Sequence, residues 1–355
     1  MRVIRVLIVD DSAIVRQVLN DELSKHPDID VVGSAMDPYM ARDKIIRLHP
    51  DVITLDLEMP RMNGLAFLAK LMKYHPLPVV VVSSLTPRNS EAAMKALELE
   101  AIEVICKPGP AYNMAEISRK LTRAIRAAAS ARITKQQVNL DTSAAGRAIH
   151  DLHFQTTHKV IAIGASTGGT KAIESVLRGL PSASPGTLIV QHMPEQFTAT
   201  FAQRLDQICQ MEVREAKDND PLWPGIALVA PGNRHMLLQQ AGEQYRVSVR
   251  NGPAVNHQRP SVDVLFQSVA NSAGNNAVGV LLSGMGADGA KGLLAMHEKG
   301  AYTLAQDEQT CVVFGMPREA IRLGAVDRVA PIEHIPGAII NFLQMQEGGT
   351  ERKAL

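Results

Sequence analysis

The stretch "VIAIGASTGGTKAIESVL", from Val160 to Leu177, joins an apolar run to a helical pattern through a glycine-rich turn. A continuous apolar strand that leads through a tight turn into a helix is the repeating unit of parallel α/β sheets. One serine, Ser166, lies at the centre of the turn. Such a turn can bind a phosphate group or present its serine as a nucleophile, and the surrounding residues distinguish these two functions.

Two known patterns fit this turn to different degrees. The dinucleotide-binding pattern G-x-G-x-x-G requires glycine at the position of Ser166, because the backbone there must approach a pyrophosphate closely. The nucleophile-elbow pattern G-x-S-x-G is satisfied by Gly164, Ser166 and Gly168, between the strand and the helix that the pattern requires. Most glycine-rich turns of this kind are structural, so the pattern alone is weak. It favours a serine nucleophile over a nucleotide-binding dehydrogenase.

A serine nucleophile needs a base, and the base needs a carboxylate that orients it. The run "LIVQHMP" places His192 at the carboxyl end of the next strand, and "VLLSGMGADGAKGL" places Asp288 just beyond a later strand. The carboxyl ends of parallel strands meet at one edge of a sheet, so we predict a triad of Ser166, His192 and Asp288. Taken singly, His192 could be a structural hydrogen-bonding residue and Asp288 a helix N-cap. The chain order Ser, His, Asp also differs from that of α/β-hydrolases, which indicates a different fold.

Short apolar runs and amphipathic helical stretches alternate over residues 1–128, which predicts an α/β fold with a doubly wound, flavodoxin-like sheet. The predicted strands are "VLIVDD", "VVGSA", "VITLDLEMP", "PVVVVSS" and "EVICKP". The predicted helices lie near residues 13–25, 38–48, 64–74, 88–99 and 113–128.

The chain after residue 128 predicts a linker and a second domain. Residues 129–158 lose both periodicities and gain polar residues, which is typical of a linker. Residues 159–347 repeat the β/α alternation, which predicts a second α/β domain with a parallel sheet. Within that domain, residues 212–252 alternate like antiparallel strands, with turns at Asp-Asn-Asp-Pro and Ala-Gly. We therefore expect an antiparallel β insertion there.

Five polar residues follow or end four strands of the first domain: Asp10, Asp11, Asp56, Ser83 and Lys107. They would converge on one edge of the sheet, where the carboxylates would repel one another unless a cation were bound. Oxygen ligands suit Mg²⁺, which shares its charge with phosphoryl groups. Lys107 and the Ser83 hydroxyl could contact the same phosphoryl oxygens. Each aspartate alone could be a helix N-cap or a solvated turn residue, but five such residues together predict a magnesium and phosphoryl site.

The motifs "VLIVDDS", "ITLDLEMPRMNG", "VVVVSSL" and "VICKP" resemble the receiver domains of bacterial two-component systems, over about residues 1–125. The resemblance implies that Asp56 accepts a phosphoryl group from a histidine kinase, and that Ser83 and Lys107 sense it. Receivers more often carry Thr at the Ser83 position, which keeps the hydroxyl. The bond from Lys107 to Pro108 is implied to be cis. The implied Mg²⁺ ligands are the carboxylates of Asp10, Asp11 and Asp56 and the backbone of Glu58.

Six motifs of the second domain resemble, over residues 159 to about 345, the catalytic domain of the CheB family of chemotaxis receptor methylesterases. They are "AIGASTGGT", "QHMPEQFTATFAQRL", "APGNRHM", "GPAVNHQRPSVDVLFQSVA", "GVLLSGMGADGAKGL" and "TCVVFGMPREAI". The resemblance implies that Ser166 attacks the γ-methyl ester of a glutamate on a methyl-accepting chemoreceptor. His192 would take the serine proton and later give it to methanol, and Asp288 would orient His192.

The same resemblance implies further features of the second domain. The backbone N–H of Met285, with Thr167 nearby, would stabilise the oxyanion, and the domain would also deamidate receptor glutamines. Ser283 stands where family members often have Thr, and Lys171 where an acidic residue is frequent. Neither change touches the predicted triad. The esterase itself needs no cofactor under this interpretation.

Charge and composition narrow the remaining function classes. With 37 basic and 36 acidic residues, the chain lacks a basic excess that would bind nucleic acid phosphates. The second half has no helix-turn-helix spacing or basic stripe, which argues against the alternative of a DNA-binding transcriptional response regulator. Three scattered cysteines predict neither a disulfide framework nor a zinc site. The sequence shows no signal-peptide pattern and no apolar stretch of membrane-spanning length, so we expect a cytoplasmic protein without direct membrane insertion.

Overall fold

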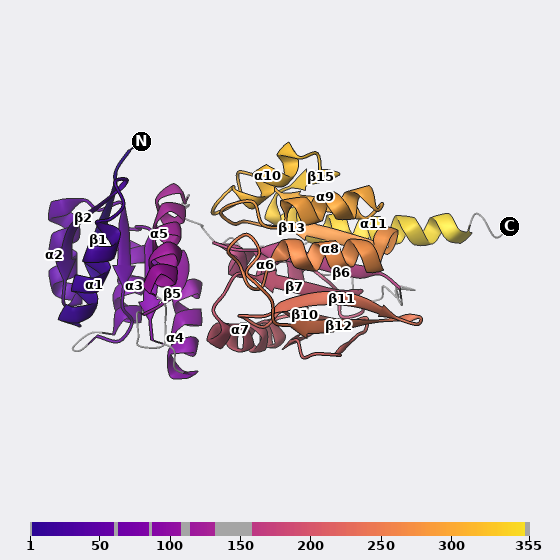
Figure 1. Cartoon of the computed structure of the whole chain (residues 1–355), viewed down its shortest axis with the longest axis horizontal. Helices are drawn as coiled ribbons and strands as arrows, with labels where there is room; N and C mark the ends of the chain where they lie inside the picture. Colours follow the sequence, from indigo (N-terminus) through magenta and orange to yellow (C-terminus); the bar gives the residue numbers. More distant parts are fainter. Residues whose placement is uncertain (1, 60–62, 85–86, 108–113, 132–157, 352–355) are drawn as a thin grey trace. The chain divides into compact units, whose positions relative to one another are not determined.

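The apolar runs of the N-terminal unit, Met1–Ile133, form five parallel strands in the order β2-β1-β3-β4-β5 (Figure 1). The computed structural model describes residues 2–59, 63–84, 87–107, 114–131 and 158–351. The strands are β1 (Ile4–Val9), β2 (Ile29–Ala35), β3 (Val52–Leu55), β4 (Val79–Ser83) and β5 (Glu103–Cys106). Every residue of β3 and β4 is buried, as expected for central strands covered on both faces.

Three helices of this unit begin where short polar side chains cap their free N–H groups. Ser12, Asp37 and Asn63 are N-cap residues whose side chains accept hydrogen bonds from the first turn. Right-handed crossovers place the first helix on one face of the sheet and the next three on the other. The helices are α1 (Ala13–Leu23), α2 (Pro38–Leu48), α3 (Gly64–Tyr74), α4 (Pro87–Glu98) and α5 (Met114–Ser130). The doubly wound, flavodoxin-like prediction is confirmed, with α5 running two residues past its expected end.

The C-terminal unit, Thr134–Leu355, contains a second parallel sheet of seven strands in the order β15-β14-β13-β6-β7-β10-β8. The strands are β6 (Val160–Ala165), β7 (Gly186–Gln191), β8 (Glu212–Glu215), β10 (Ile226–Val229), β13 (Ala277–Leu281), β14 (Tyr302–Gln306) and β15 (Arg328–Ala330). The buried β6 lies between β7 and β13, so residues that follow these three strands meet at one edge of the sheet.

Two groups of helices pack on this sheet (Figure 1). In the first group, α6 contacts both α7 and α11. In the second group, α9 contacts both α8 and α10. Their bounds are α6 (Gly169–Arg178), α7 (Glu195–Ile208), α8 (Val262–Ser272), α9 (Ala290–Glu298), α10 (Met316–Arg322) and α11 (Ile335–Glu351), with short 3₁₀ turns at Gly274–Asn276 and Ile332–His334. Across the described residues, we find no helix whose length and apolar character would let it cross a bilayer.

The predicted antiparallel insertion is confirmed as a separate three-stranded sheet, which is shorter than the predicted stretch. Strands β11 (His235–Ala241) and β12 (Gln244–Arg250) form an antiparallel hairpin that turns at Gly242 and Glu243, one residue beyond the predicted Ala-Gly turn, and β9 (Pro221–Leu222) pairs with β12. Strands β8 and β10 come from the same stretch of sequence but run parallel within the main sheet, which corrects the prediction for them. The apolar run of β10 is mostly buried beside β7, which an alternating surface hairpin would not allow.

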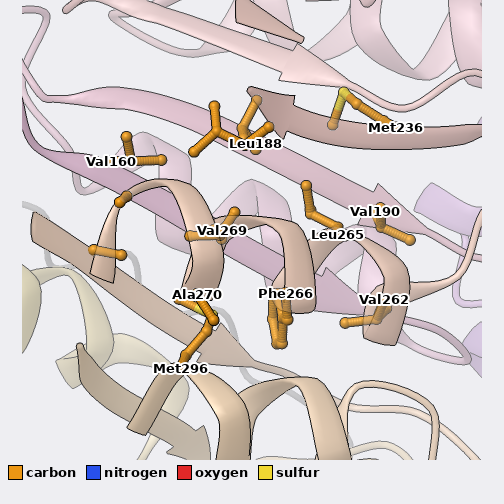
Figure 2. Packing of buried hydrophobic residues seen from close by; sticks show 14 of the residues in the cluster. Val160, Leu188, Val190, Met236, Val262, Leu265, Phe266, Val269, Ala270 and Met296 are labelled. Carbon is orange, nitrogen blue, oxygen red and sulfur yellow. The ribbon is translucent and has the colours of Figure 1, made fainter. Parts of the chain in front are cut away.

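Helix α8 is anchored by four fully buried hydrophobic side chains. Figure 2 shows Val262, Leu265, Phe266 and Val269 of α8 among side chains from the sheets and from α9. All four are 0% exposed, and at roughly 1.5–3 kcal/mol for each large side chain this burial holds the helix firmly. The N-terminal turn of α8 is therefore a rigid support for the residues that contact it.

Candidate active site and phosphoacceptor site

The predicted nucleophile Ser166 lies in the turn between β6 and α6 and is 4% exposed. Its N–H donates to the carbonyl oxygen of Ser283, at 2.9 Å, after β13. Its carbonyl oxygen accepts from the N–H of Gly169 at 2.7 Å and from Nε2 of Gln191 at 2.8 Å. Hydrogen bonds from the segments after β13 and β7 thus fix the backbone of Ser166 and do not involve its hydroxyl group.

Glycine is required at two positions around this turn. Gly168 has a φ of +76°, a left-handed conformation that glycine adopts without steric cost. A Cβ atom at Gly284 would lie 2.7 Å from the Cβ of Ser166 and 2.2 Å from the Sδ of Met316. The segment that carries Gly284 and Met285 therefore packs directly against the serine.

His192 follows β7 and lies beside the serine turn, because its backbone N–H donates to the carbonyl oxygen of Ala165 at 3.2 Å. Its Nε2 lies 2.8 Å from Oδ2 of Asp288, and the two side chains are 5% and 3% exposed. Since a carboxylate accepts, Nε2 carries the proton and Nδ1 is the basic nitrogen. In the described part of the chain, Nδ1 is buried with no hydrogen bond partner, so it is the atom positioned to take a proton.

Asp288 precedes α9 and faces the N-terminus of α8. It accepts hydrogen bonds from the N–H of Val262 at 2.7 Å, from Oγ of Ser261 at 2.8 Å and from Nδ2 of Asn256 at 2.8 Å. Burial would raise the pKa of Asp288, but the hydrogen bond and charge of His192, with the bonds from Asn256 and Ser261, lower it to about 2. Asp288 is therefore an anion at neutral pH and accepts the hydrogen bond of the His192 imidazole as a carboxylate.

The two predicted oxyanion residues lie on segments adjacent to the serine. Thr167 is the next residue along the elbow and is buried, and its carbonyl oxygen accepts from Oγ of Ser283 at 2.8 Å. Met285 follows Gly284, which packs against Ser166. Their contact with an oxyanion stays a prediction.

Four residues that hold the site were not assigned a role from the sequence: Gln191, Asn256, Ser261 and Ser283. All four lie inside the motifs that carry the family resemblance, but nothing in their spacing indicates contact with the triad. Gln191 carried a usable signal, because a polar residue at the end of a fully buried strand must find hydrogen bond partners.

In the N-terminal unit, three predicted acidic residues converge at the carboxyl edge of the sheet. One carboxylate oxygen from each of Asp10, Asp11 and Asp56 lies within 4.8 Å of the others. Nζ of Lys107 is 2.8 Å from Oδ2 of Asp56 and 3.0 Å from Oδ2 of Asp10. Three negative charges against one positive charge leave a net negative site made of oxygen ligands. This donor set fits Mg²⁺.

Asp56 is 1% exposed, and burial raises its pKa to about 6. Lys107 opposes this shift through its hydrogen bond and charge, whereas the negative charge of Asp10 adds to it. The N–H of Glu58 donates to Oδ1 of Asp56 at 3.1 Å. The Asp56 carboxylate is thus only partly compensated by the protein, which is consistent with a place for an added cation.

Ser83 and Glu58, the remaining predicted residues of this sheet edge, lie in different surroundings. Ser83 ends β4 and is fully buried, and its carbonyl oxygen accepts from the N–H of Lys107 at 2.8 Å. The side chain of Glu58 is exposed and accepts from Oγ of Ser84 at 2.9 Å, while the role of its backbone as a metal ligand stays a prediction. The peptide bond to Pro108 and most of the predicted linker lie outside the described residues.

We expect the Asp56→Asn variant to unfold at higher temperature than the wild type near pH 7 without Mg²⁺, and the two proteins to converge near pH 4. A carboxyl with a folded pKa of about 6, above its unfolded value of 3.8, stabilises at low pH and loses this contribution as pH rises through 6. Lys107 keeps its charge in this range, since its pKa is raised. The gain should be about 1–3 kcal/mol near pH 7. Calorimetry across pH measures it, and a pH-independent difference would contradict the assignment.

The N-terminal unit has the sheet and acidic edge of a phosphoacceptor domain, and the C-terminal unit has a serine, histidine and aspartate arrangement at a sheet edge. These features define the class of response regulators whose output domain is an enzyme. A family model described as CheB methylesterase matches residues 161–339, and one described as response regulator receiver domain matches residues 6–119. The chain belongs to the CheB methylesterase family and carries a receiver domain.

Similar proteins support this membership over nearly the whole chain. A protein-glutamate methylesterase/protein-glutamine glutaminase of Syntrophus aciditrophicus is 53% identical, covering 97% of this chain and 100% of that protein. One from Geobacter metallireducens is 52% identical, covering 97% of each chain. The crystal structure of the Thermotoga maritima CheB methylesterase catalytic domain is 36% identical with a TM-score of 0.51, covering 52% of this chain and 98% of that chain. These matches favour an enzyme over the DNA-binding alternative.

Proposed function

We propose that this protein hydrolyses γ-methyl esters of glutamate side chains on methyl-accepting chemoreceptors, releases methanol, and deamidates receptor glutamines. The observation that carries the proposal is the buried pair of His192 and Asp288 directly beside the elbow serine Ser166. Family membership supports the reaction, and the names of the similar proteins support both activities. Such an enzyme would act in the cytoplasm during bacterial chemotaxis.

In the first half of the reaction, Oγ of Ser166 attacks the ester carbonyl carbon while Nδ1 of His192 takes the hydroxyl proton. Asp288 stabilises the imidazolium that forms, and the two segments that carry Met285 and Thr167 supply donors near the oxyanion. The tetrahedral intermediate then collapses. The bond to the methoxy oxygen breaks, and His192 gives its proton to that oxygen as methanol leaves.

The second half regenerates the enzyme from the glutamyl ester of Ser166. Water attacks the acyl carbon while His192 takes one of its protons, and the bond to Oγ breaks as that proton returns to the serine. The products are free Ser166 and a receptor glutamate. A glutamine side chain follows the same course, with ammonia as the first leaving group.

The receiver domain would place this reaction under the control of a histidine kinase. We infer that Asp56 is the phosphoacceptor, that Ser83 and Lys107 contact the phosphoryl group, and that Asp10, Asp11, Asp56 and the Glu58 backbone hold Mg²⁺. When bound, Mg²⁺ supplies positive charge that offsets both the carboxylates and the incoming phosphoryl group. Added charge at Asp56 then shifts the receiver towards a second conformation.

The direct test uses membranes that contain chemoreceptors labelled at their methyl ester groups. Purified protein with Mg²⁺ and a small phosphodonor should release labelled methanol, and the same membranes without protein should not. Retention of the label in the receptors, with the protein shown to be folded and phosphorylated, would contradict the proposed reaction.

A further inference from the structure

Asn256 joins the triad carboxylate to a second carboxylate outside the triad. Its Nδ2 donates to Oδ1 of Asp288 at 2.8 Å and to Oδ2 of Asp263 at 2.7 Å. Asn256 lies in a tight turn closed by paired backbone hydrogen bonds between Val255 and Gln258, at 3.0 and 2.8 Å. Its φ is +51°, in the left-handed region. Asn256 is exposed, yet its side chain bonds one buried acceptor, Asp288, and one partly buried acceptor, Asp263, and these bonds hold the left-handed residue in place.

The loop that carries Asn256 is itself fastened at several points. Nη1 of Arg259 donates to the carbonyl oxygen of Gly252 at 2.5 Å, and its Nε donates to Oδ1 of Asn233 at 3.0 Å. Nε2 of His235 donates to the carbonyl oxygen of Pro253 at 2.9 Å. These bonds tie the loop to the hairpin of β11, so the amide of Asn256 is delivered to the carboxylates by a fixed scaffold.

The amide of Asn256 lies between two carboxylates, Asp288 and Asp263, whose negative charges repel each other. The charged groups that contact or face Asp288 are His192, which bonds its Oδ2, and Asp263, whose charge opposes it. Burial raises the pKa of Asp263, the N–H of Gly292 lowers it, and the negative charge of Asp288 raises it further. The two hydrogens of the Asn256 amide serve one carboxylate each, so they reduce a repulsion that would otherwise turn Asp288 away from His192.

We propose that Asn256 is a positioning residue for the esterase: by bridging Asp288 and Asp263 it fixes the orientation of Asp288, and thereby the orientation of the His192 imidazole that Asp288 holds. This inference rests on the triad of the proposed function. Asn256 contacts neither the nucleophile nor the base, so it acts through Asp288 alone.

Three variants of the full-length protein distinguish loss of the Asn256 amide from a change in the conformation of its loop. Asn256→Gly removes the amide and keeps the left-handed backbone without strain. Asn256→Asp keeps the size of the side chain and its tolerance of positive φ, but replaces the donor with a third carboxylate. His257→Gly is the matched control. His257 is exposed and has a φ of +63°, so its replacement by glycine changes the backbone freedom of the turn in the same way as Asn256→Gly does.

We expect kcat for methanol release to fall about tenfold in Asn256→Gly and further in Asn256→Asp, with KM within twofold of wild type and His257→Gly unchanged. A purely structural role predicts the reverse order, with the isosteric aspartate milder than glycine. That order would overturn the proposal.

The same assays distinguish failure of this inference from failure of the proposed function. If Ser166→Ala and Asp288→Asn abolish methanol release while the Asn256 variants match the wild type, only the positioning role is wrong. If Ser166→Ala remains active, the triad itself is wrong. The proton on Nε2 of His192, which is hydrogen-bonded to Asp288, should give a downfield proton NMR resonance that can be measured without substrate. This resonance should broaden in Asn256→Gly and persist in His257→Gly.

Discussion

Replacing Ser166 with alanine is expected to lower kcat for methyl ester hydrolysis about 10⁴–10⁶-fold, because the side chain that forms the covalent bond is gone and the triad acts as a unit. The fold should remain, since the bonds that hold Ser166 come from its backbone N–H and carbonyl. Methanol release from methylated receptors measures the loss, and calorimetry confirms that the variant is folded.

A matched control for this experiment is Ser184→Ala. Ser184 is also a buried serine of the C-terminal unit, 1% exposed, and its Oγ donates to the carbonyl oxygen of Pro181 at 2.7 Å, away from the triad. Its loss should cost about 1 kcal/mol of stability and leave kcat within twofold of wild type. Residual turnover of Ser166→Ala at the level of this control would assign the nucleophile to another residue.

The sequence predicted which of these residues lie together at the two sheet edges, because they follow buried strands of parallel sheets. Strand periodicity is a strong signal, and sheet topology brings strand ends together without further information. Asp10, Asp56 and Lys107 meet in this way in the first unit, as do Ser166 and His192 in the second. No side chain contact had to be known in advance.

The loop contacts around Asp288 were not predictable by the same logic. Asn256 and Ser261 reach Asp288 from a turn with left-handed residues and from the N-cap of α8, and no strand or helix period places such a loop. The parallel direction of β8 and β10 was missed because short strands with turns between them resemble hairpins. The direction of a short strand depends on the neighbouring strand beside which it is buried, and this neighbour is known only from the folded chain.

Two buried aspartates at sheet edges show how local donors decide the charge of a carboxyl. Asp288 receives several hydrogen bonds from neutral donors and from His192, and its pKa falls to about 2. For Asp56, burial outweighs the contributions of Lys107 and Glu58, and its pKa rises to about 6. The charge of the first carboxylate is fully compensated by donors of the protein, whereas the second is an anion at neutral pH whose charge the protein compensates only in part.

This contrast leads to the expectation that Asp56 is labelled by a small phosphodonor only when Mg²⁺ is present. A carboxylate oxygen of Asp56 must attack phosphorus and form an acyl phosphate, while the leaving group of the donor departs with the bonding electrons. Asp10 and Asp11 lie within 4.8 Å and repel the phosphodonor dianion, and Lys107 supplies only one positive charge against three negative ones. A divalent cation reverses this field, so chelation should reduce labelling at least about 100-fold.

The labelling experiment compares Asp56→Asn with Asp30→Asn, using a radioactive small phosphodonor. Asp56→Asn should take up no label, because asparagine keeps the hydrogen bond from the Glu58 N–H but lacks the attacking carboxylate oxygen. Asp30 is an exposed aspartate on β2, so Asp30→Asn should label as the wild type does. Undiminished label on Asp56→Asn would place the phosphoacceptor elsewhere. Equal labelling of the wild type in chelator would show that Lys107 alone compensates the incoming charge, and the magnesium site would then be wrong even though Asp56 were the acceptor.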